Sequence, residues 1–218
     1  MLSLTEENYL KAIYHLSHDG AQGVSTSEIA EAMQTRAASV TDMIKKLSAK
    51  GMISYEKYYG VQITRQGKVD ALAVIRKHRL WETFLVKKLG FDWGEVHEVA
   101  EQLEHIQSPL LIEKLDVFLG HPSHDPHGHP IPDRHGRMKE ERKQPLSNIR
   151  KGTQARVCSV KDSSSTFLQY LDKLGIRIGT VLEVQEIETF DGSLEVVVDG
   201  KKKTSLSREV SENILIGI

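Results

Sequence analysis

The sequence contains little of what characterises an exported or membrane-bound protein. Its 218 residues include one cysteine, Cys158, so no internal disulfide can form and nothing indicates an oxidising compartment. No apolar run approaches the ~18 residues of a membrane-spanning helix. The first residues, Met1–Glu7, become acidic too early for a signal peptide. We therefore expect a cytoplasmic protein with no membrane partner.

An excess of charge of one sign is also missing. Lys+Arg 29 against Asp+Glu 30 leaves a net charge of −1, and 39% hydrophobic with 27% charged residues is typical of a globular chain. Any nucleic-acid binding must therefore come from a local surface. Residues 36–68 form such a segment, with seven basic and two acidic residues, whereas residues 75–120 hold six basic and eight acidic residues.

The N-terminal part has the element order of a winged helix-turn-helix. Apolar residues recur at helical spacing from Leu4 to Leu16, and Ser25-Thr26-Ser27-Glu28 is a capping box that opens a short helix over 28–33. A third helix is predicted over 36–50, ending at Gly51. Two β-type runs, 52–57 and 61–64, surround Tyr58-Tyr59-Gly60 and predict a hairpin.

The third predicted helix carries polar and basic residues away from its apolar stripe. In a winged helix this face can enter a major groove, with Lys and Arg on phosphates and Ser39, Thr41 and Asp42 at base edges. The alternative is a helical bundle whose lysines are merely solvated. We expect the DNA-binding residues to be Thr26, Arg36, Ala38, Ser39, Thr41, Asp42, Lys46 and Lys50.

The middle of the chain combines three predicted helices, over 69–89, 95–103 and 109–119, with clustered His and Glu residues. His97, Glu101, Glu104 and His105 fall at i, i+4, i+7 and i+8, an arc of about 100° on one helix. His78 and Glu82 are an i, i+4 pair on the preceding helix. Helical bundles bind first-row metals with such groups. Either helix alone could instead present a solvated Glu/His face. The apolar content of these helices exceeds what one winged helix can cover, which favours a homodimer.

The types of ligand restrict the metal and the chemistry. Oxygen and imidazole ligands without a thiolate suit Mn²⁺ or Fe²⁺ and allow Zn²⁺ or other divalent transition metals in vitro. Neither H-E-x-x-H nor H-x-x-E-H occurs, so a metal-dependent hydrolase is the weaker alternative and we do not expect an enzyme. A DNA-binding protein with an inert Glu/His face is a third interpretation.

A loop rich in histidine and proline separates the middle from the C-terminal part. Residues 121–135 contain five of the ten histidines and four of the six prolines, so 120–145 is predicted to be a loop. Proline-rich chain is poorly suited to a rigid ligand cage, and we leave this loop out of the metal site.

The C-terminal part predicts a small SH3-like β-barrel. Five short β runs, at 155–160, 178–186, 194–198, 204–206 and 214–218, accompany one helix over 165–174. The predicted fold is therefore mainly α with small β. The predicted domains are a winged helix-turn-helix (1–73), a helical dimerisation and metal-binding domain with its linker (74–143) and an SH3-like domain (144–218).

Several groups of residues together resemble one family. They are Met43–Leu47 with Gly51-Met52-Ile53, Arg76–Glu82, Val96-His97-Glu98, Glu104-His105, and Gly128–Pro132. With these motifs the chain resembles the diphtheria-toxin-repressor and manganese-transport-regulator family over essentially its whole length. The resemblance implies a homodimeric, metal-activated repressor that binds operator DNA and silences genes for manganese or iron uptake when the metal is plentiful.

The resemblance also implies two neighbouring metal sites. His78, Glu82 and His97 correspond to one, and Glu101, Glu104 and His105 with Asn8 correspond to the other. Manganese-type members have Glu at position 101 and Asp at position 8, whereas iron-type members have Cys and Met, so the chain matches the manganese type at Glu101 alone. Lys11 stands where manganese-type members often place a second-site carboxylate. Asp162 is the residue of the tail that could replace an anionic ligand of iron-type members.

Position 8 predicts how metal and DNA are linked. Asn8 belongs to the first predicted helix, which lies beside the helix predicted to bind DNA, while the other ligands belong to the middle of the chain. We expect metal binding to join these parts and to set the spacing of two recognition helices, which must match half-sites ~34 Å apart.

Overall fold

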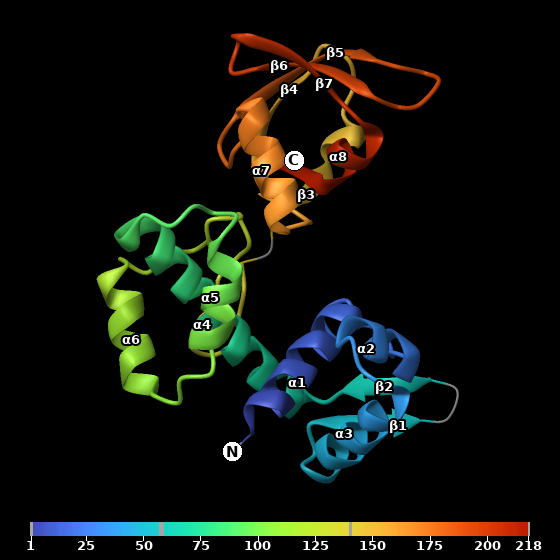
Figure 1. Ribbon diagram of the computed structural model, residues 1–218, viewed down its shortest axis with the longest axis vertical. Coiled ribbons are helices and arrows are strands. Elements are labelled where there is room, and N and C mark those ends of the chain that lie inside the picture. The colour runs from blue at the N-terminus through green and yellow to red at the C-terminus, as the bar shows by residue number, and fades with distance from the viewer. Residues whose placement is uncertain (1, 57–58, 140, 218) are drawn as a thin grey trace. The chain divides into compact units, whose positions relative to one another are not determined.

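The structure is a computed structural model that describes residues 2–56, 59–139 and 141–217 (Figure 1). Lys57 and Tyr58 of the predicted hairpin and Ile218 of the predicted last strand lie outside the described residues. The chain forms two compact units. Unit 1 consists of Met1–His78, Glu101–Ile112 and Pro132–Met138, and unit 2 of Arg79–Ala100, Glu113–Ile131 and Lys139–Ile218.

Unit 1 contains the winged helix-turn-helix. Ser3 and Ser25 each form a capping box with the Glu three residues later. The first helix begins where the sequence predicts, whereas the second begins at Thr26, two residues before its predicted start. Val40, Ile44 and Leu47 are the buried stripe of the third helix, whose opposite face is exposed. The elements are α1 (Leu4–Leu16), α2 (Thr26–Ala32), α3 (Ala37–Ala49), β1 (Ile53–Glu56) and β2 (Gly60–Ile63), with β1 and β2 antiparallel.

Three further helices follow the hairpin: α4 (Arg65–Leu89), α5 (Val96–Leu103) and α6 (Pro109–Phe118). The helix α4 begins four residues before the predicted start, because Thr64 Oγ1 accepts a hydrogen bond from Gly67 N at 3.0 Å and caps its first turn. The helix α5 ends at Leu103, so Glu104 and His105 lie in the turn that follows it. The expected single helical arc from His97 to His105 is therefore wrong.

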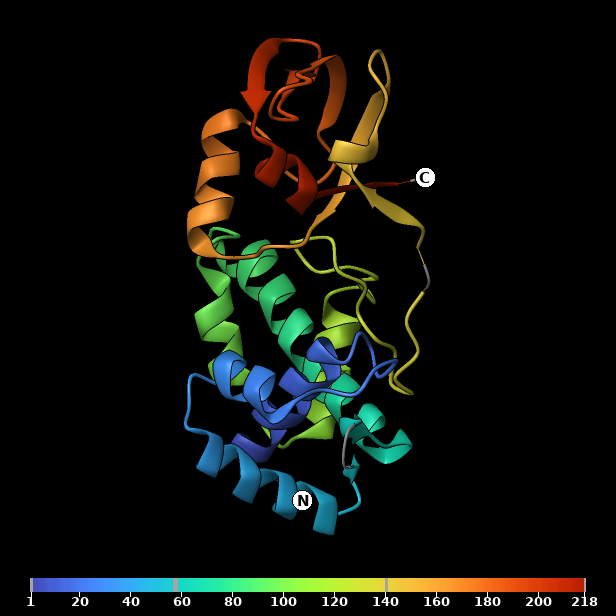
Figure 2. The ribbon, with the colours of Figure 1, turned by 90° about the vertical axis from the view of Figure 1, so that its right-hand side faces the viewer.

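Unit 2 ends in a small β-barrel-like domain, in which two helices pack beside a six-stranded sheet (Figure 2). The strands run in the order β3-β8-β4-β5-β6-β7, and every neighbouring pair is antiparallel. The predicted SH3-like domain is confirmed, and its described residues form one strand and two short helices, η1 and α8, more than the sequence indicated. The elements are β3 (Lys143–Pro145), η1 (Leu146–Asn148), β4 (Gln154–Val160), α7 (Ser165–Leu174), β5 (Val181–Ile187), β6 (Leu194–Val198), β7 (Lys202–Leu206), α8 (Arg208–Asn213) and β8 (Ile214–Gly217).

The histidine-rich segment before this domain has no helix or strand among its described residues, as predicted. It is nevertheless ordered by its packing: Asp125, His127 and Ile131 are buried, and Asp125 N donates to His129 O at 3.0 Å. None of the described helices is long and apolar enough to cross a membrane.

Candidate metal centre

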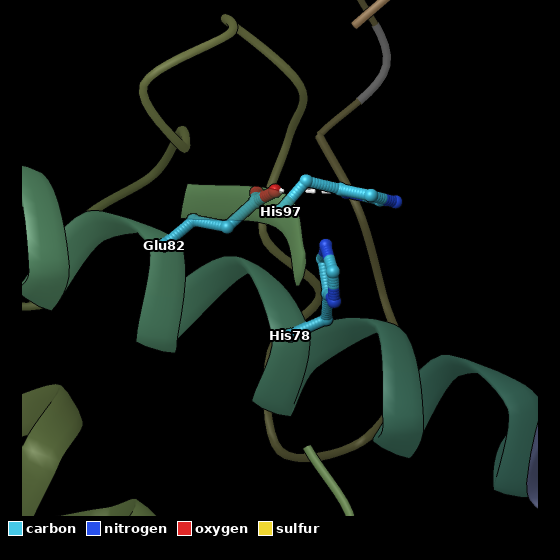
Figure 3. Close-up of side chains that lie close together, drawn as sticks. All are labelled: His78, Glu82 and His97. Atoms are coloured by element: carbon cyan, nitrogen blue, oxygen red, sulfur yellow. Dashed lines mark hydrogen bonds and ion pairs between the residues drawn. The ribbon is translucent and has the colours of Figure 1, made fainter. Parts of the chain in front are cut away.

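Helix α4 brings the first group of predicted ligands together. His78 and Glu82 lie one turn apart on α4, so the helix itself fixes their spacing. His97, from the start of α5, places Nδ1 3.4 Å from Glu82 Oε1. One possible ligand atom from each residue lies within 4.8 Å of those of the other two (Figure 3). Glu82 is buried and His97 is half-buried, as in a site with one open side.

Glu104 is the centre of a second group, which lies in unit 1. Its side chain is fully buried, at 0% exposure, and His78 Nδ1 lies 2.5 Å from Oε2 while Lys11 Nζ lies 2.6 Å from Oε1. Burial alone would raise the pKa of Glu104, but the hydrogen bond from His78 and the charge of Lys11 hold it below its usual range. Glu104 is therefore a carboxylate at neutral pH, which is the form that binds a metal.

Helix α1 supplies the rest of this second group. The buried carboxylate of Glu7 lies 2.6 Å from His105 Nδ1 and accepts a hydrogen bond from Gln107 Nε2 at 2.8 Å. Glu7 and Lys11 are four residues apart and share one face of α1. The sequence analysis did not include Glu7 in the metal site, although its position directly before Asn8 was a usable signal.

Asn8 provides a test of whether this group fits a cation. Its Oδ1 is buried and has no hydrogen-bond partner among the described residues. A buried carbonyl oxygen without a partner is costly, and a metal ion is one way to satisfy it. Carboxylates, imidazoles and this amide oxygen together suit Mn²⁺ or Fe²⁺. Glu101 is largely exposed, with Oε1 3.7 Å from Lys11 Nζ.

The loop that the sequence analysis set aside forms a third group, in unit 2. Asp125, His127 and His129 each offer a ligand atom within 4.8 Å of the others, and His127 Nδ1 lies 3.6 Å from Glu82 Oε2. Asp125 Oδ1 accepts hydrogen bonds from His127 N at 2.8 Å and His129 N at 2.9 Å, which makes the loop rigid. The proline-rich chain thus brings three potential ligand atoms together, while the exclusion of this loop from the metal site stays a prediction.

Backbone carbonyls orient the two imidazoles of this loop. His127 Nε2 lies 2.7 Å from Trp93 O, and His129 Nε2 lies 2.8 Å from Val160 O. A carbonyl oxygen only accepts hydrogen bonds, so each Nε2 carries a proton and each Nδ1 faces the carboxylates. In a metal-binding histidine, the ring nitrogen that does not bind the metal commonly donates to such a carbonyl. Burial lowers the pKa of His127, but the hydrogen bond and charge of Glu82 outweigh it and raise the pKa above its ordinary value.

The predicted DNA-binding residues form a separate surface on unit 1. The predicted residues at the N-cap of α3, within α3 and at its C-cap, Lys50, are exposed. Thr26, at the start of α2, is half-buried. Three are engaged within the unit: Lys50 Nζ lies 2.7 Å from Glu6, Asp42 Oδ1 lies 3.5 Å from Lys45 Nζ, and Thr41 Oγ1 donates to Ala37 O at 2.9 Å. The other exposed residues of this surface are Arg36, Ala38, Ser39 and Lys46.

Three family models match successive parts of the chain. Residues 1–61 match the iron dependent repressor N-terminal DNA binding domain, residues 64–133 the metal binding and dimerisation domain of the same repressors, and residues 144–217 the FeoA domain. An HTH-type transcriptional regulator of Methanocaldococcus jannaschii is 34% identical over 118 residues, covering 54% of this chain and 94% of its own. This chain belongs to the iron-dependent repressor family.

A second curated relative matches about half of the chain, and a solved structure extends the match to 97% of it. The iron-dependent repressor IdeR of Mycobacterium leprae is 34% identical over 124 residues, which span 57% of this chain and 54% of IdeR. A solved manganese-dependent transcriptional repressor in complex with manganese is 33% identical, with a TM-score of 0.87 over 97% of this chain and 99% of that one. The predicted winged helix, helical domain and SH3-like tail are all confirmed by these matches.

Membership of the iron-dependent repressor family bears on one of the interpretations left open by the sequence, the metal-dependent hydrolase. The family consists of DNA-binding transcriptional repressors, and the matches give the hydrolase alternative no support. The structure brings His78, Glu82 and His97 together, and it places Glu104 beside His78 and His105. Glu7 contacts His105, and the loop residue His127 lies beside Glu82.

Proposed function

We propose that this member of the iron-dependent repressor family is a metal-activated homodimeric repressor that acts in the cytoplasm. It binds the operator DNA of metal-uptake genes when Mn²⁺ or Fe²⁺ is plentiful and is not an enzyme. We keep the three-domain division at 73/74 and 143/144 as part of this proposal, supported by the three successive family matches.

One observation carries the proposal. Helix α1 belongs to the winged helix, yet its Glu7 and Lys11 contact His105 and Glu104 rather than the DNA surface. A change in this group therefore acts directly on the helix that packs behind the recognition helix α3, since Tyr9, Ile13 and Val40 share one core. The proposed metal ligands around Glu104 and the recognition helix α3 thus contact the same helix, α1.

The ligands we propose divide into two sets. The first contains Asn8, Glu101, Glu104 and His105, with Glu7 beside His105; the second contains His78, Glu82 and His97, with the loop residues Asp125, His127 and His129 on the other side of Glu82. The bound divalent ion would supply positive charge that holds these carboxylates together. The chain contributes the rigid placement: α4 spaces His78 from Glu82, and backbone carbonyls fix both loop imidazoles.

Helix α6 supports the dimer. Four large apolar side chains on it are exposed: Leu110, Leu111, Val117 and Phe118. Exposed apolar side chains concentrated on one short helix favour an interface with a second copy, and a two-fold dimer places two recognition helices on one duplex. Asp42, Ser39 and Thr41 would then read base edges while Arg36, Lys46 and Lys50 contact phosphates.

Fluorescence anisotropy on DNA from upstream of this protein's own gene tests the proposal. The titration is run anaerobically at fixed salt, with Mn²⁺ or Fe²⁺ added first and EDTA last, because affinity for DNA depends strongly on salt. The proposal predicts binding that appears with metal and is lost with EDTA, and predicts that Asn8→Ala weakens the metal response. Tight binding that ignores EDTA would instead identify a constitutive DNA-binding protein with an inert Glu/His face.

A further inference from the structure

Lys11 occupies an unusual position for a lysine. Its side chain is 16% exposed, and its ammonium lies 2.6 Å from Glu104 Oε1 and 3.7 Å from Glu101 Oε1. The ammonium thus points into the group of carboxylates that the proposed function assigns to a metal ion. A buried lysine is retained only where it is paired, because the desolvation of its charge is costly.

The contacts of Glu104 show what this ammonium does to the carboxylate. Oε2 of Glu104 lies 2.5 Å from His78 Nδ1. Oε1 of Glu104 lies 2.6 Å from Lys11 Nζ and 3.7 Å from His105 Nε2. A carboxylate bridges two metal ions by giving one oxygen to each. The Lys11 ammonium already takes Oε1, so Glu104 has one oxygen left that a divalent ion could share with His78.

The charges around Lys11 also disfavour a second divalent ion beside Glu104. Glu101 and Glu104 contact Lys11, and Glu7 lies one turn before Lys11 on α1. Lys11 and Lys77 supply fixed positive charges beside these three carboxylates, with Lys77 Nζ 3.7 Å from Glu7 Oε1. A second divalent ion beside Oε1 would meet the Lys11 charge within about 4 Å, where like charges repel strongly in a site of low dielectric constant. The ammonium also joins α1 to residue 104 by itself, as a bound ion would.

We propose that Lys11 is a built-in cation of the Glu104 group: its ammonium takes the place of a second divalent ion and limits this group to one metal ion per chain. The inference rests on the proposed function, because it takes the Glu104 group to be metal-binding. Lys11 is accordingly a residue that determines metal stoichiometry, and it is not itself a ligand.

Counting bound Mn²⁺ tests this directly. Full-length protein is stripped with EDTA, desalted and titrated with Mn²⁺, and free Mn²⁺ is measured from its room-temperature EPR signal. We expect Lys11→Met to bind one more Mn²⁺ per chain than wild type, and Lys11→Arg, which keeps the charge, to bind the wild-type number. The matched control is Lys203→Met, which removes the same charge and an ion pair of the same 2.6 Å length, with Glu195, in the C-terminal domain.

The outcomes separate this inference from the proposed function. A Lys11→Met variant that binds no more Mn²⁺ than wild type, while melting cooperatively, overturns the role of Lys11 and leaves the repressor proposal standing. Wild type that binds no Mn²⁺ contradicts the repressor proposal and overturns the inference with it, because the inference takes the Glu104 group to hold one ion. If Lys11→Met does not fold, Lys11→Gln, which stays polar, is measured in its place under the same criteria.

Discussion

Replacing Glu104 by glutamine tests whether one buried carboxylate holds unit 1 together. The change preserves the shape of a fully buried side chain and removes its charge. Lys11 Nζ, which lies 2.6 Å from Glu104 Oε1, would keep its charge but face a neutral amide in place of the carboxylate. Only 16% of the Lys11 side chain is exposed to solvent that could compensate. Removing one partner of a buried ion pair costs about 3–5 kcal/mol.

The lower part of that range applies to Glu104, because Glu101 Oε1 also lies 3.7 Å from the Lys11 ammonium and compensates in part. We therefore expect Glu104→Gln to lower the free energy of unfolding of the metal-free protein by about 3 kcal/mol. At about 2–4 °C per kcal/mol for a chain of this size, the melting midpoint should fall by roughly 6–12 °C. Thermal and urea denaturation at pH 7 in EDTA measure both quantities.

Glu6→Gln is the matched control. Glu6 pairs with Lys50 at 2.7 Å, but that lysine is 41% exposed, and such pairs contribute at most about 1 kcal/mol. Glutamine can also keep the hydrogen bond from Ser3 N that Glu6 accepts in the capping box. Equal losses for Glu104→Gln and Glu6→Gln would refute the reasoning that burial makes the Lys11 pair strong.

The pH dependence of the same variant gives a second check. Because the pKa of Glu104 is lowered in the folded protein, its contribution to stability is present above the unfolded pKa of ~4.3 and is lost as the pH falls through the lower folded value. Glu104→Gln should lose this part of the acid dependence of unfolding.

Three further predictions concern the loop, the DNA surface and one glycine. The pKa of His127 is raised, so the stability from its contact with Glu82 is present below ~6.5 and lost as the pH rises through the folded value; the melting midpoint of metal-free wild type should decline more steeply from pH 6 to 9 than that of His127→Gln. Arg36→Ala should weaken DNA binding uniformly across sequences and reduce the salt slope of anisotropy titrations by about 1, and an unchanged slope would remove Arg36 from the phosphate contacts. A Cβ on Gly128, at φ +81°, would lie 1.9 Å from Cys158 O, so Gly128→Ala should destabilise the protein by at least ~2 kcal/mol more than Gly152→Ala, which has φ +78° and nothing within 4 Å, as measured by urea denaturation.

Much of the fold could be predicted where local signals and burial agree. The helix α7 begins after the Ser164 cap and ends at Gly175 in the left-handed conformation, and both of its ends match the prediction. The helix α8 was missed because six residues show no helical period; its Ser207 cap was the available signal. Strand β3 was missed because three residues carry no pattern and its pairing with β8 is distant in sequence.

The metal groups were predicted in part, for physical reasons. His78 and Glu82 follow from helical spacing, which the sequence shows. The place of Glu104 was predicted wrongly by extending a helix that ends at Leu103. The roles of Glu7 and His127 depend on tertiary partners, His105 and the carbonyl of Trp93, that no local pattern reveals. The sequence supplies the ligand types, and packing decides which of them meet.

If metal and DNA act on one equilibrium through helix α1, each must change the protein's affinity for the other by the same factor. The Mn²⁺ affinity of the protein is measured by the EPR signal of free Mn²⁺, once alone and once saturated with operator DNA at the same salt. We expect DNA to tighten Mn²⁺ binding by the same factor by which Mn²⁺ tightens DNA binding, about 5–150-fold for couplings of this kind. Equal Mn²⁺ affinity with and without DNA would contradict it.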